Sequence, residues 1–250
     1  MKIRQTPEKG FTLIELLVVI SIIAILAGIA VPAFTGVITR GQQTKALSDA
    51  KQVYLGLKMF AGDNDGAFPF RDRTGADLTS GSSSNDAFRN IVPDYVKSEK
   101  IFAVTKSAFT RGTPDENTST ETETLKAGEN HWAYVLNLSD TSNPNLPIIA
   151  DGFNNASTAV YSADETQPGG VWKGEAAIVV RVDGSGRVER IKPQTSGSGS
   201  SATTTRAVIG PVGGTEDKNI FTEHTDNWLS TSQVPVNPEE GGGATTGGTD

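Results

Sequence analysis

The sequence contains no cysteine and only two histidines, His131 and His224. Without cysteine, the chain can form neither a disulfide framework nor a thiolate metal site. His131 begins a predicted strand. His224 lies in residues 219–229, a short segment near the C-terminus that is predicted to be ordered. A lone histidine in such a place is usually a packed or solvated residue. No G-x-S-x-G elbow, P-loop or H-E-x-x-H segment is present either. The sequence therefore predicts a protein that is not an enzyme.

Basic residues are also in the minority. The chain has 22 Lys and Arg against 29 Asp and Glu, a formal net charge of −7. Removing the first ten residues, which hold Lys2, Arg4, Glu8 and Lys9, changes this net charge to −9. Affinity for nucleic acids comes largely from basic residues that neutralise phosphates. The charge balance therefore argues against a nucleic-acid partner.

One long apolar stretch, residues 11–34, dominates the N-terminal part of the chain. As a helix with a rise of about 1.5 Å per residue it would span roughly 36 Å, more than the ~30 Å hydrocarbon core of a bilayer. The short polar segment before it carries net positive charge, which favours a cytoplasmic N-terminus. The pattern predicts a single helix in membrane lipid, with the rest of the chain outside the cytoplasm.

Two features separate this stretch from an ordinary secretory signal. The small residue Gly10 precedes the apolar run, so cleavage after it would retain the hydrophobic segment. Glu15 lies within the run, where an ionised carboxylate costs roughly 2.5 to 3.5 kcal/mol and usually has a partner. Glu15 could reach the lipid headgroups. Alternatively, its complement is the new amine that cleavage would create on Phe11, in the same chain or in a staggered copy.

The segment from Gly10 to Glu15, GFTLIE followed by an apolar helix, resembles the class III signal of type IV pilins and type II secretion pseudopilins. The resemblance implies that a prepilin peptidase cuts between Gly10 and Phe11 and methylates the new N-terminal phenylalanine. It further implies that Glu15 guides subunits into a helical filament and that Pro32 kinks the helix. The motif covers about the first 35 of the 250 residues; beyond it, the likeness is to general architecture.

The resemblance predicts a structural subunit of a type IV-like filament. Its expected partners are other pilins or pseudopilins, including copies of itself, and an inner-membrane assembly platform. The missing C-terminal cysteine pair, which closes a loop in many type IV pilins, favours a pseudopilin of type II secretion that builds a periplasmic pseudopilus for protein export. A type IV pilin for adhesion, motility or DNA uptake is the alternative. A membrane-tethered binding or hydrolytic domain is an alternative from another class.

The predicted fold is α+β and pilin-like. A long hydrophobic helix, kinked near Pro32, continues as an amphipathic helix that packs on an antiparallel sheet. Apolar residues recur at helical spacing up to a predicted helix end at Gly62. The predicted segments are a leader (1–10), a transmembrane or filament-core helix (11–40), a periplasmic α+β domain (41–192), and a Ser/Thr/Gly-rich linker with a mostly disordered tail (193–250).

Within the globular part, alternation and turn residues predict the secondary structure. A short helix is expected at 85–92, capped by Ser84 or Asn85, and a polar surface loop at 110–128. The expected strands are 131–136, 146–150 and a hairpin of 176–182 with 187–191, with weaker candidates in 95–104 and at 158–161. The Ser/Thr/Gly-rich run 194–205 is predicted to be a flexible linker.

Acidic turns raise the question of calcium. The turn Asp63-Asn64-Asp65-Gly66 fails as an EF-hand loop, because that register would need an acid at Ala61. Asp151 and Asp183 each precede a glycine and are best explained as turn formers. Some pseudopilins bind calcium through loop carboxylates, so the resemblance makes these two residues the candidate calcium ligands. No other cofactor is expected.

Overall fold

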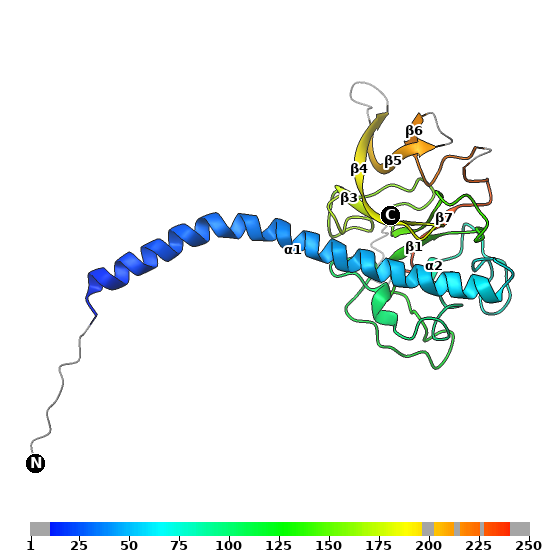
Figure 1. Ribbon diagram of the computed structural model, residues 1–250, viewed down its shortest axis with the longest axis horizontal. Helices are drawn as coiled ribbons and strands as arrows, with labels where there is room; N and C mark the ends of the chain where they lie inside the picture. The colour runs from blue at the N-terminus through cyan, green and yellow to red at the C-terminus, as the bar shows by residue number, and fades with distance from the viewer. Residues whose placement is uncertain (1–10, 197–202, 213–215, 226–227, 241–250) are drawn as a thin grey trace, which may run out of the picture. The chain divides into compact units, whose positions relative to one another are not determined.

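The computed structural model describes residues 11–196, 203–212, 216–225 and 228–240. The chain divides into two compact units, Met1–Gln42 and Gln43–Asp250. Helix α1, Leu13–Asp63, contributes to both (Figure 1). It ends one residue beyond the predicted Gly62, where the chain turns through Asp65 and Gly66, both with positive φ.

Helix α1 is continuous from Leu13 to Asp63. No helix in the described part of the chain combines the length and the apolar character needed to cross a membrane. The cleavage-site residue Gly10 lies outside the described residues, and so does the side chain of Pro32. Processing at Gly10, the kink at Pro32 and membrane insertion therefore stay predictions.

In the second unit, one stripe of α1 is buried at helical spacing. Its members are at most 3% exposed: Ala46, Ala50, Val53, Leu57 and Ala61. These positions follow one another at three or four residues, which places them on a single helix face. The Tyr54 hydroxyl donates a hydrogen bond to the Val182 carbonyl oxygen, so a polar contact also ties the helix to the end of the sheet. The predicted amphipathic helix is confirmed.

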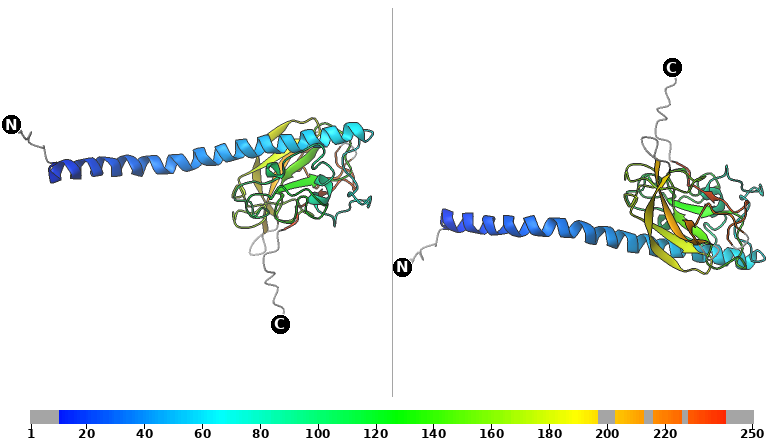
Figure 2. Two further views of the ribbon diagram at one scale, coloured as in Figure 1. Left: turned by 90° about the horizontal axis from the view of Figure 1, so that it is seen from below. Right: turned by 90° about the horizontal axis from the view of Figure 1, so that it is seen from above.

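A seven-stranded antiparallel sheet covers this stripe, in the order β6-β5-β4-β3-β2-β1-β7. Figure 2 shows the C-terminal part of α1 along one face of the sheet. The strands are β1 Trp132–Val135, β2 Pro147–Asp151, β3 Ala176–Arg181, β4 Gly186–Ser196, β5 Thr203–Val212, β6 Glu216–Asn219 and β7 Pro235–Val236. The α+β fold and the β3–β4 hairpin are as the sequence predicts.

Three of the shorter predicted elements differ from the structure. The helix near residue 85 is α2, Ser84–Phe88, and its N-cap is Ser83, whose side chain accepts from the Asp86 amide. Residues 95–104 contain no strand but a 3-10 helix, η1 Glu99–Phe102. Its apolar residues Ile101 and Phe102 are adjacent, and Phe102 is buried within this single turn. The segment 158–161 forms only an isolated bridge, between Asn155 and Val160.

The largest correction concerns the end of the chain. The predicted linker 194–205 supplies the ends of β4 and β5, whose pairing continues as far as Ser196 opposite Thr203. Threonine is β-branched and favours strands, so its abundance here works against a flexible linker. In the predicted tail, β7 pairs with β1, and Val236 is buried. Leu229 is buried too, as expected of the ordered patch that the sequence predicts at 219–229. The described residues up to Glu240 are therefore part of the fold.

Candidate functional site

Three features could carry function: the start of α1 with its apolar surface, a buried network around His131, and a group of three carboxylates. At the start of α1, the amide and the hydroxyl of Thr12 each donate to Oε2 of Glu15 at 2.9 Å. The Glu15 amide in turn donates to the Thr12 hydroxyl oxygen at 3.2 Å. This reciprocal pattern is a capping box, which satisfies free amides at a helix N-terminus.

The capping box gives Glu15 a partner that the sequence analysis missed. The pattern Thr12-Leu13-Ile14-Glu15 is the S/T-x-x-E signature of such a box, so the sequence contained the signal. Within this chain the Glu15 carboxylate therefore contacts Thr12. Pairing of Glu15 with the amine of Phe11 stays a prediction.

The first unit exposes its apolar side chains. Those between Phe11 and Ile38 that are large and exposed have exposed fractions from 48% to 86%: Phe11, Leu13, Ile14, Leu16, Leu17, Val18, Val19, Ile20, Ile22, Ile23, Ile25, Leu26, Ile29, Phe34, Val37 and Ile38. Soluble monomers rarely expose so large a contiguous apolar surface, and such surfaces mark sites that contact lipid or protein. The apolar character of this surface therefore suits contact with lipid or with another protein.

A serine, a histidine and an aspartate meet inside the second unit. His131 places Nδ1 2.6 Å from the Ser107 hydroxyl oxygen and Nε2 2.7 Å from Oδ1 of Asp151. The other oxygen of Asp151 accepts from the Trp172 indole at 2.8 Å and from the Ile178 amide at 2.7 Å. The network thus joins β2, β3 and the residue before β1.

These three residue types also make up a nucleophilic triad. Here, however, Ser107 is only 6% exposed, His131 1% and Asp151 0%. A substrate carbonyl cannot reach the buried hydroxyl, so the arrangement holds the sheet together and has no open site for acyl transfer. His131 is the packed residue that the sequence predicts. Its partners could not be predicted, because only the pairing of β1 with β2 brings residues 131 and 151 together.

The two candidate calcium ligands lie in different settings. Asp151 is the last residue of β2 and both of its oxygens accept hydrogen bonds from buried groups, so its assignment as a turn former is wrong. Calcium binding at Asp151 stays a prediction. Asp183 lies in the β3–β4 turn, where Oδ1 accepts from the Ser185 amide at 2.7 Å, as expected of a turn former.

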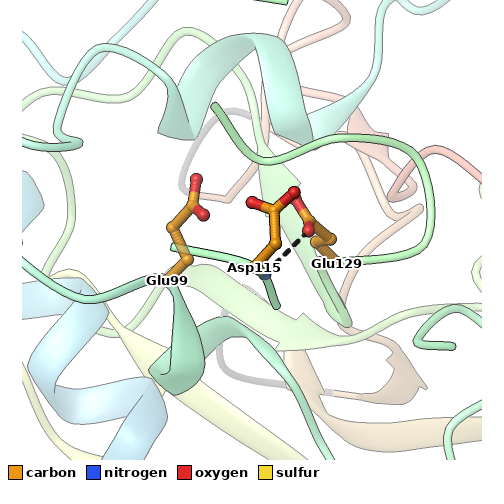
Figure 3. A group of neighbouring side chains, drawn as sticks. All are labelled: Glu99, Asp115 and Glu129. Carbon is orange, nitrogen blue, oxygen red and sulfur yellow. Dashed lines mark hydrogen bonds between the residues drawn. The ribbon is translucent and has the colours of Figure 1, made fainter. Parts of the chain in front are cut away.

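A third group of carboxylates escaped the sequence analysis. Glu99, Asp115 and Glu129 each bring one oxygen within 4.8 Å of the other two (Figure 3). The Asp115 amide donates to Oε1 of Glu129 at 3.1 Å, which fixes these two segments together. The three residues are 14 to 30 positions apart in the sequence. Neither periodicity nor a metal-binding motif links them, so only the fold reveals the group.

Comparison with known proteins agrees with the N-terminal features. Residues 6–31 match the family model of the prokaryotic N-terminal methylation motif. The type IV major pilin protein PilA of Myxococcus xanthus is 26% identical over 195 residues, covering 72% of this chain and 83% of the relative. The type IV major pilin protein PilE of Neisseria gonorrhoeae is 37% identical over 104 residues, covering 39% of this chain and 53% of the relative.

A type IV major fimbrial protein FimA of Dichelobacter nodosus is 39% identical over 75 residues, which cover 30% of this chain and 48% of the relative. The matches to PilE and FimA thus span about half of those relatives. No solved structure matches the chain significantly. The motif and these relatives show that the chain is similar to type IV pilins, most specifically in its N-terminal segment. The relatives named here are structural pilins and not enzymes.

Proposed function

We propose that this chain is stored in the inner membrane, is processed after Gly10 and is assembled into a filament. The exposed apolar surface of α1 between Phe11 and Ile38, directly after a methylation motif, is the observation that supports this function. Lipid would cover that surface before assembly, and the α1 helices of other subunits would cover it afterwards. Such an exchange needs no catalysis by the subunit.

Helix association in this proposal depends on close packing. Helices that leave lipid gain little from the hydrophobic effect, so van der Waals contact between small residues drives their association. Ala24, Ala27 and Gly28 lie among the exposed residues of α1 and supply such a small surface. Beyond its neighbours and the nearby backbone of its own helix, a Cβ at Gly28 would meet no atom within 4 Å, so packing within the chain does not require a glycine there.

Glu15 would then act twice. Within the chain, it caps α1 through Thr12, and both donated bonds end on Oε2. Oε1 of the same carboxylate can accept a hydrogen bond from the methylated amine of Phe11 in a staggered neighbouring subunit. An acid without such a partner is costly in an apolar filament core, so only subunits at the correct stagger would assemble.

Two kinds of filament are compatible with this role. The relatives are named type IV major pilins or fimbrial proteins, which favours a surface pilus with a role in adhesion, motility or DNA uptake. The absence of cysteine favours a pseudopilus of type II secretion. Immunogold electron microscopy of intact cells distinguishes them, because labelled fibres outside the cell support a pilus. Labelling only in the periplasm, with loss of protein export on gene deletion, supports a pseudopilus.

Intact mass and N-terminal sequencing of the protein recovered from cells test the processing step. A mature chain that begins at N-methylated Phe11 is the expected result. A functional chain that retains residues 1–10 would contradict the proposal. A truncated variant that starts near Gln42 can be assayed against glycans and peptides. Hydrolysis or tight binding of either would instead support a tethered hydrolytic or binding domain.

Variants at the start of α1 test the two roles of Glu15 separately. Glu15→Gln keeps a side chain that can complete a capping box but removes the charge, and Glu15→Leu removes both. We expect both variants to insert into the membrane and to lose filaments. Thr12→Ala keeps the charge and serves as the matched control, with filament yield largely retained. Normal filaments from Glu15→Gln would refute the charge pairing.

A further inference from the structure

The carboxylate group of Glu99, Asp115 and Glu129 is assembled from three separate segments. Glu99 is the first residue of η1, Asp115 lies in the polar loop 110–128, and Glu129 lies shortly before β1. Their burial is graded, from Glu99 with no exposed surface through Glu129 to the exposed Asp115. The group therefore has a buried end and an end that is open to solvent (Figure 3).

One oxygen of the buried carboxylate has no partner. Oε1 of Glu99 accepts a hydrogen bond from the Leu125 amide at 2.7 Å. Oε2 is buried and has no hydrogen-bond partner. A buried polar atom without a partner in the protein is rare, so this oxygen is a candidate to bind a further group. Because this atom belongs to a group of three acids, a cation is the partner that fits its charge.

The nearest ammonium group does not fill this place. Lys126 Nζ lies 2.5 Å from Oδ2 of Asp115 and 3.1 Å from Oε2 of Glu123, on the solvent side of the group. The Lys126 amide donates to Oε2 of Glu129 at 2.8 Å. Lysine thus neutralises Asp115, while Glu99 and Glu129 keep oxygens that a positive charge can bind.

Electrostatics within the group agree with this reasoning. Burial raises the pKa of Glu99, although its bond from the Leu125 amide lowers it, and the charges of Glu129 and Asp115 raise it further. Three close carboxylates disfavour one another's ionised forms, and a bound cation reverses that effect. A divalent ion would therefore hold all three residues ionised at neutral pH.

We propose that Glu99, Asp115 and Glu129 form a calcium-binding site. All of the protein ligands would be carboxylate oxygens, the type that Ca²⁺ and Mg²⁺ prefer. The three oxygens lie within 4.8 Å of one another, close enough to share one ion. Ca²⁺ accepts irregular coordination, whereas Mg²⁺ demands near-ideal octahedral geometry, so carboxylates from three separate segments suit Ca²⁺ better. Water at the open end completes the coordination.

The ion would fix the polar loop to the rest of the second unit. No residue from 110 to 128, all of which the structure describes, lies in a helix or strand. Calcium at this site would tie that loop to η1 and to the start of β1 in a single contact. This site differs from the predicted Asp151 and Asp183, and it does not depend on whether the subunit builds a pilus or a pseudopilus.

Calorimetric titration tests the site on the full-length chain in detergent, stripped with EDTA and dialysed. CaCl₂ should bind once per chain with a dissociation constant of about 10⁻⁴ to 10⁻³ M, the range of extracellular calcium modules, and should raise the melting temperature. MgCl₂ should bind at least tenfold more weakly. Glu99→Gln should weaken calcium binding at least tenfold, while the control Glu121→Gln, in the same loop but outside the group, should leave it unchanged.

Asp115→Asn keeps the test decisive if the buried Glu99→Gln variant fails to fold. Asp115 is exposed, so this variant should fold and should also lose at least tenfold in calcium affinity. Wild-type protein that binds no calcium up to 10 mM, about tenfold above the weakest expected constant, would overturn the proposal. Retention of wild-type affinity in Asp115→Asn would overturn it as well.

Discussion

The two units of this chain place the same kind of side chain in opposite surroundings. In the first unit, large aliphatic residues such as Ile14 and Ile29 are each 74% exposed. In the second unit, Leu57 on the same helix is fully buried, as are Trp132 and Tyr134 of the facing sheet. A continuous helix can therefore change from outward-facing to inward-facing without a change in secondary structure. What differs is whether the chain itself supplies the covering surface.

The two units therefore differ in how much their own packing contributes to the free energy of unfolding. The second unit has its own core and gains free energy from burying apolar side chains within the chain. The described residues of the first unit bury no comparable core, and under the proposed function lipid or other subunits would cover their apolar side chains. Substitutions in the second unit should affect unfolding, and substitutions in the first should affect assembly. The predictions below test this division, from the largest expected effect to the smallest.

Asp151→Ala should give the largest loss of stability. The substitution leaves the Trp172 indole, the Ile178 amide and the His131 ring without their buried acceptor. Each buried donor left without an acceptor typically costs about 1 to 3 kcal/mol. Urea unfolding of the full-length chain in detergent, followed by near-UV circular dichroism, measures it. Asp183→Ala, in an exposed turn, is the control and should cost below about 1 kcal/mol. Similar losses of unfolding free energy from both variants would show that the buried network does not contribute more to stability than an exposed turn.

Leu57→Ala and Leu26→Ala compare the two environments on one helix. Leu57 is fully buried and Leu26 is 61% exposed. A Leu→Ala change in a core costs about 2 to 5 kcal/mol, whereas an exposed position usually changes stability by less than about 0.5 kcal/mol. We expect Leu57→Ala to lower unfolding stability and Leu26→Ala to lower filament yield only. A marked loss of unfolding stability in Leu26→Ala would contradict the division between the units.

Thr12→Ala should have a smaller effect, confined to the first turn of α1. The variant removes the hydroxyl that accepts from the Glu15 amide, and loss of such a cap costs about 1 kcal/mol. Amide hydrogen exchange in detergent should show faster exchange at residues 13–16 and unchanged exchange in β1 to β3. Faster exchange throughout the sheet would mean that the two units unfold together.

The pH dependence of the calcium-free protein should be the most modest effect. The pKa of Glu99 is raised above its usual 4.5 chiefly by burial. A raised pKa contributes stability that is present below pH 4.5 and is lost as the pH rises through the folded value. In EDTA, the melting temperature of the wild type should therefore fall relative to that of Glu99→Gln as the pH rises from 4.5 through the pKa of Glu99 in the folded protein. A parallel pH dependence in both would show that Glu99 is not the group responsible.

Local patterns were sufficient for the long elements. The apolar stripe of α1 and the β3–β4 hairpin were correctly predicted, because helical spacing and strand alternation are properties of adjacent residues. Segments of low apolar content were predicted less well. The run 194–205 was assigned to a linker from its serine and glycine, although its threonines pair across β4 and β5. Strand pairing there depends on a partner strand and not on the segment's own hydrophobicity.

By itself, the sequence determined the N-terminal processing motif, the long apolar helix and the α+β class, since each is written in neighbouring residues. Only the tertiary structure decided that His131 meets Ser107 and Asp151, and that Glu99, Asp115 and Glu129 converge. These groups come from segments that pair through the sheet or through loops, and no local periodicity records such contacts. The burial of Glu99 Oε2 is likewise a property of the packed fold.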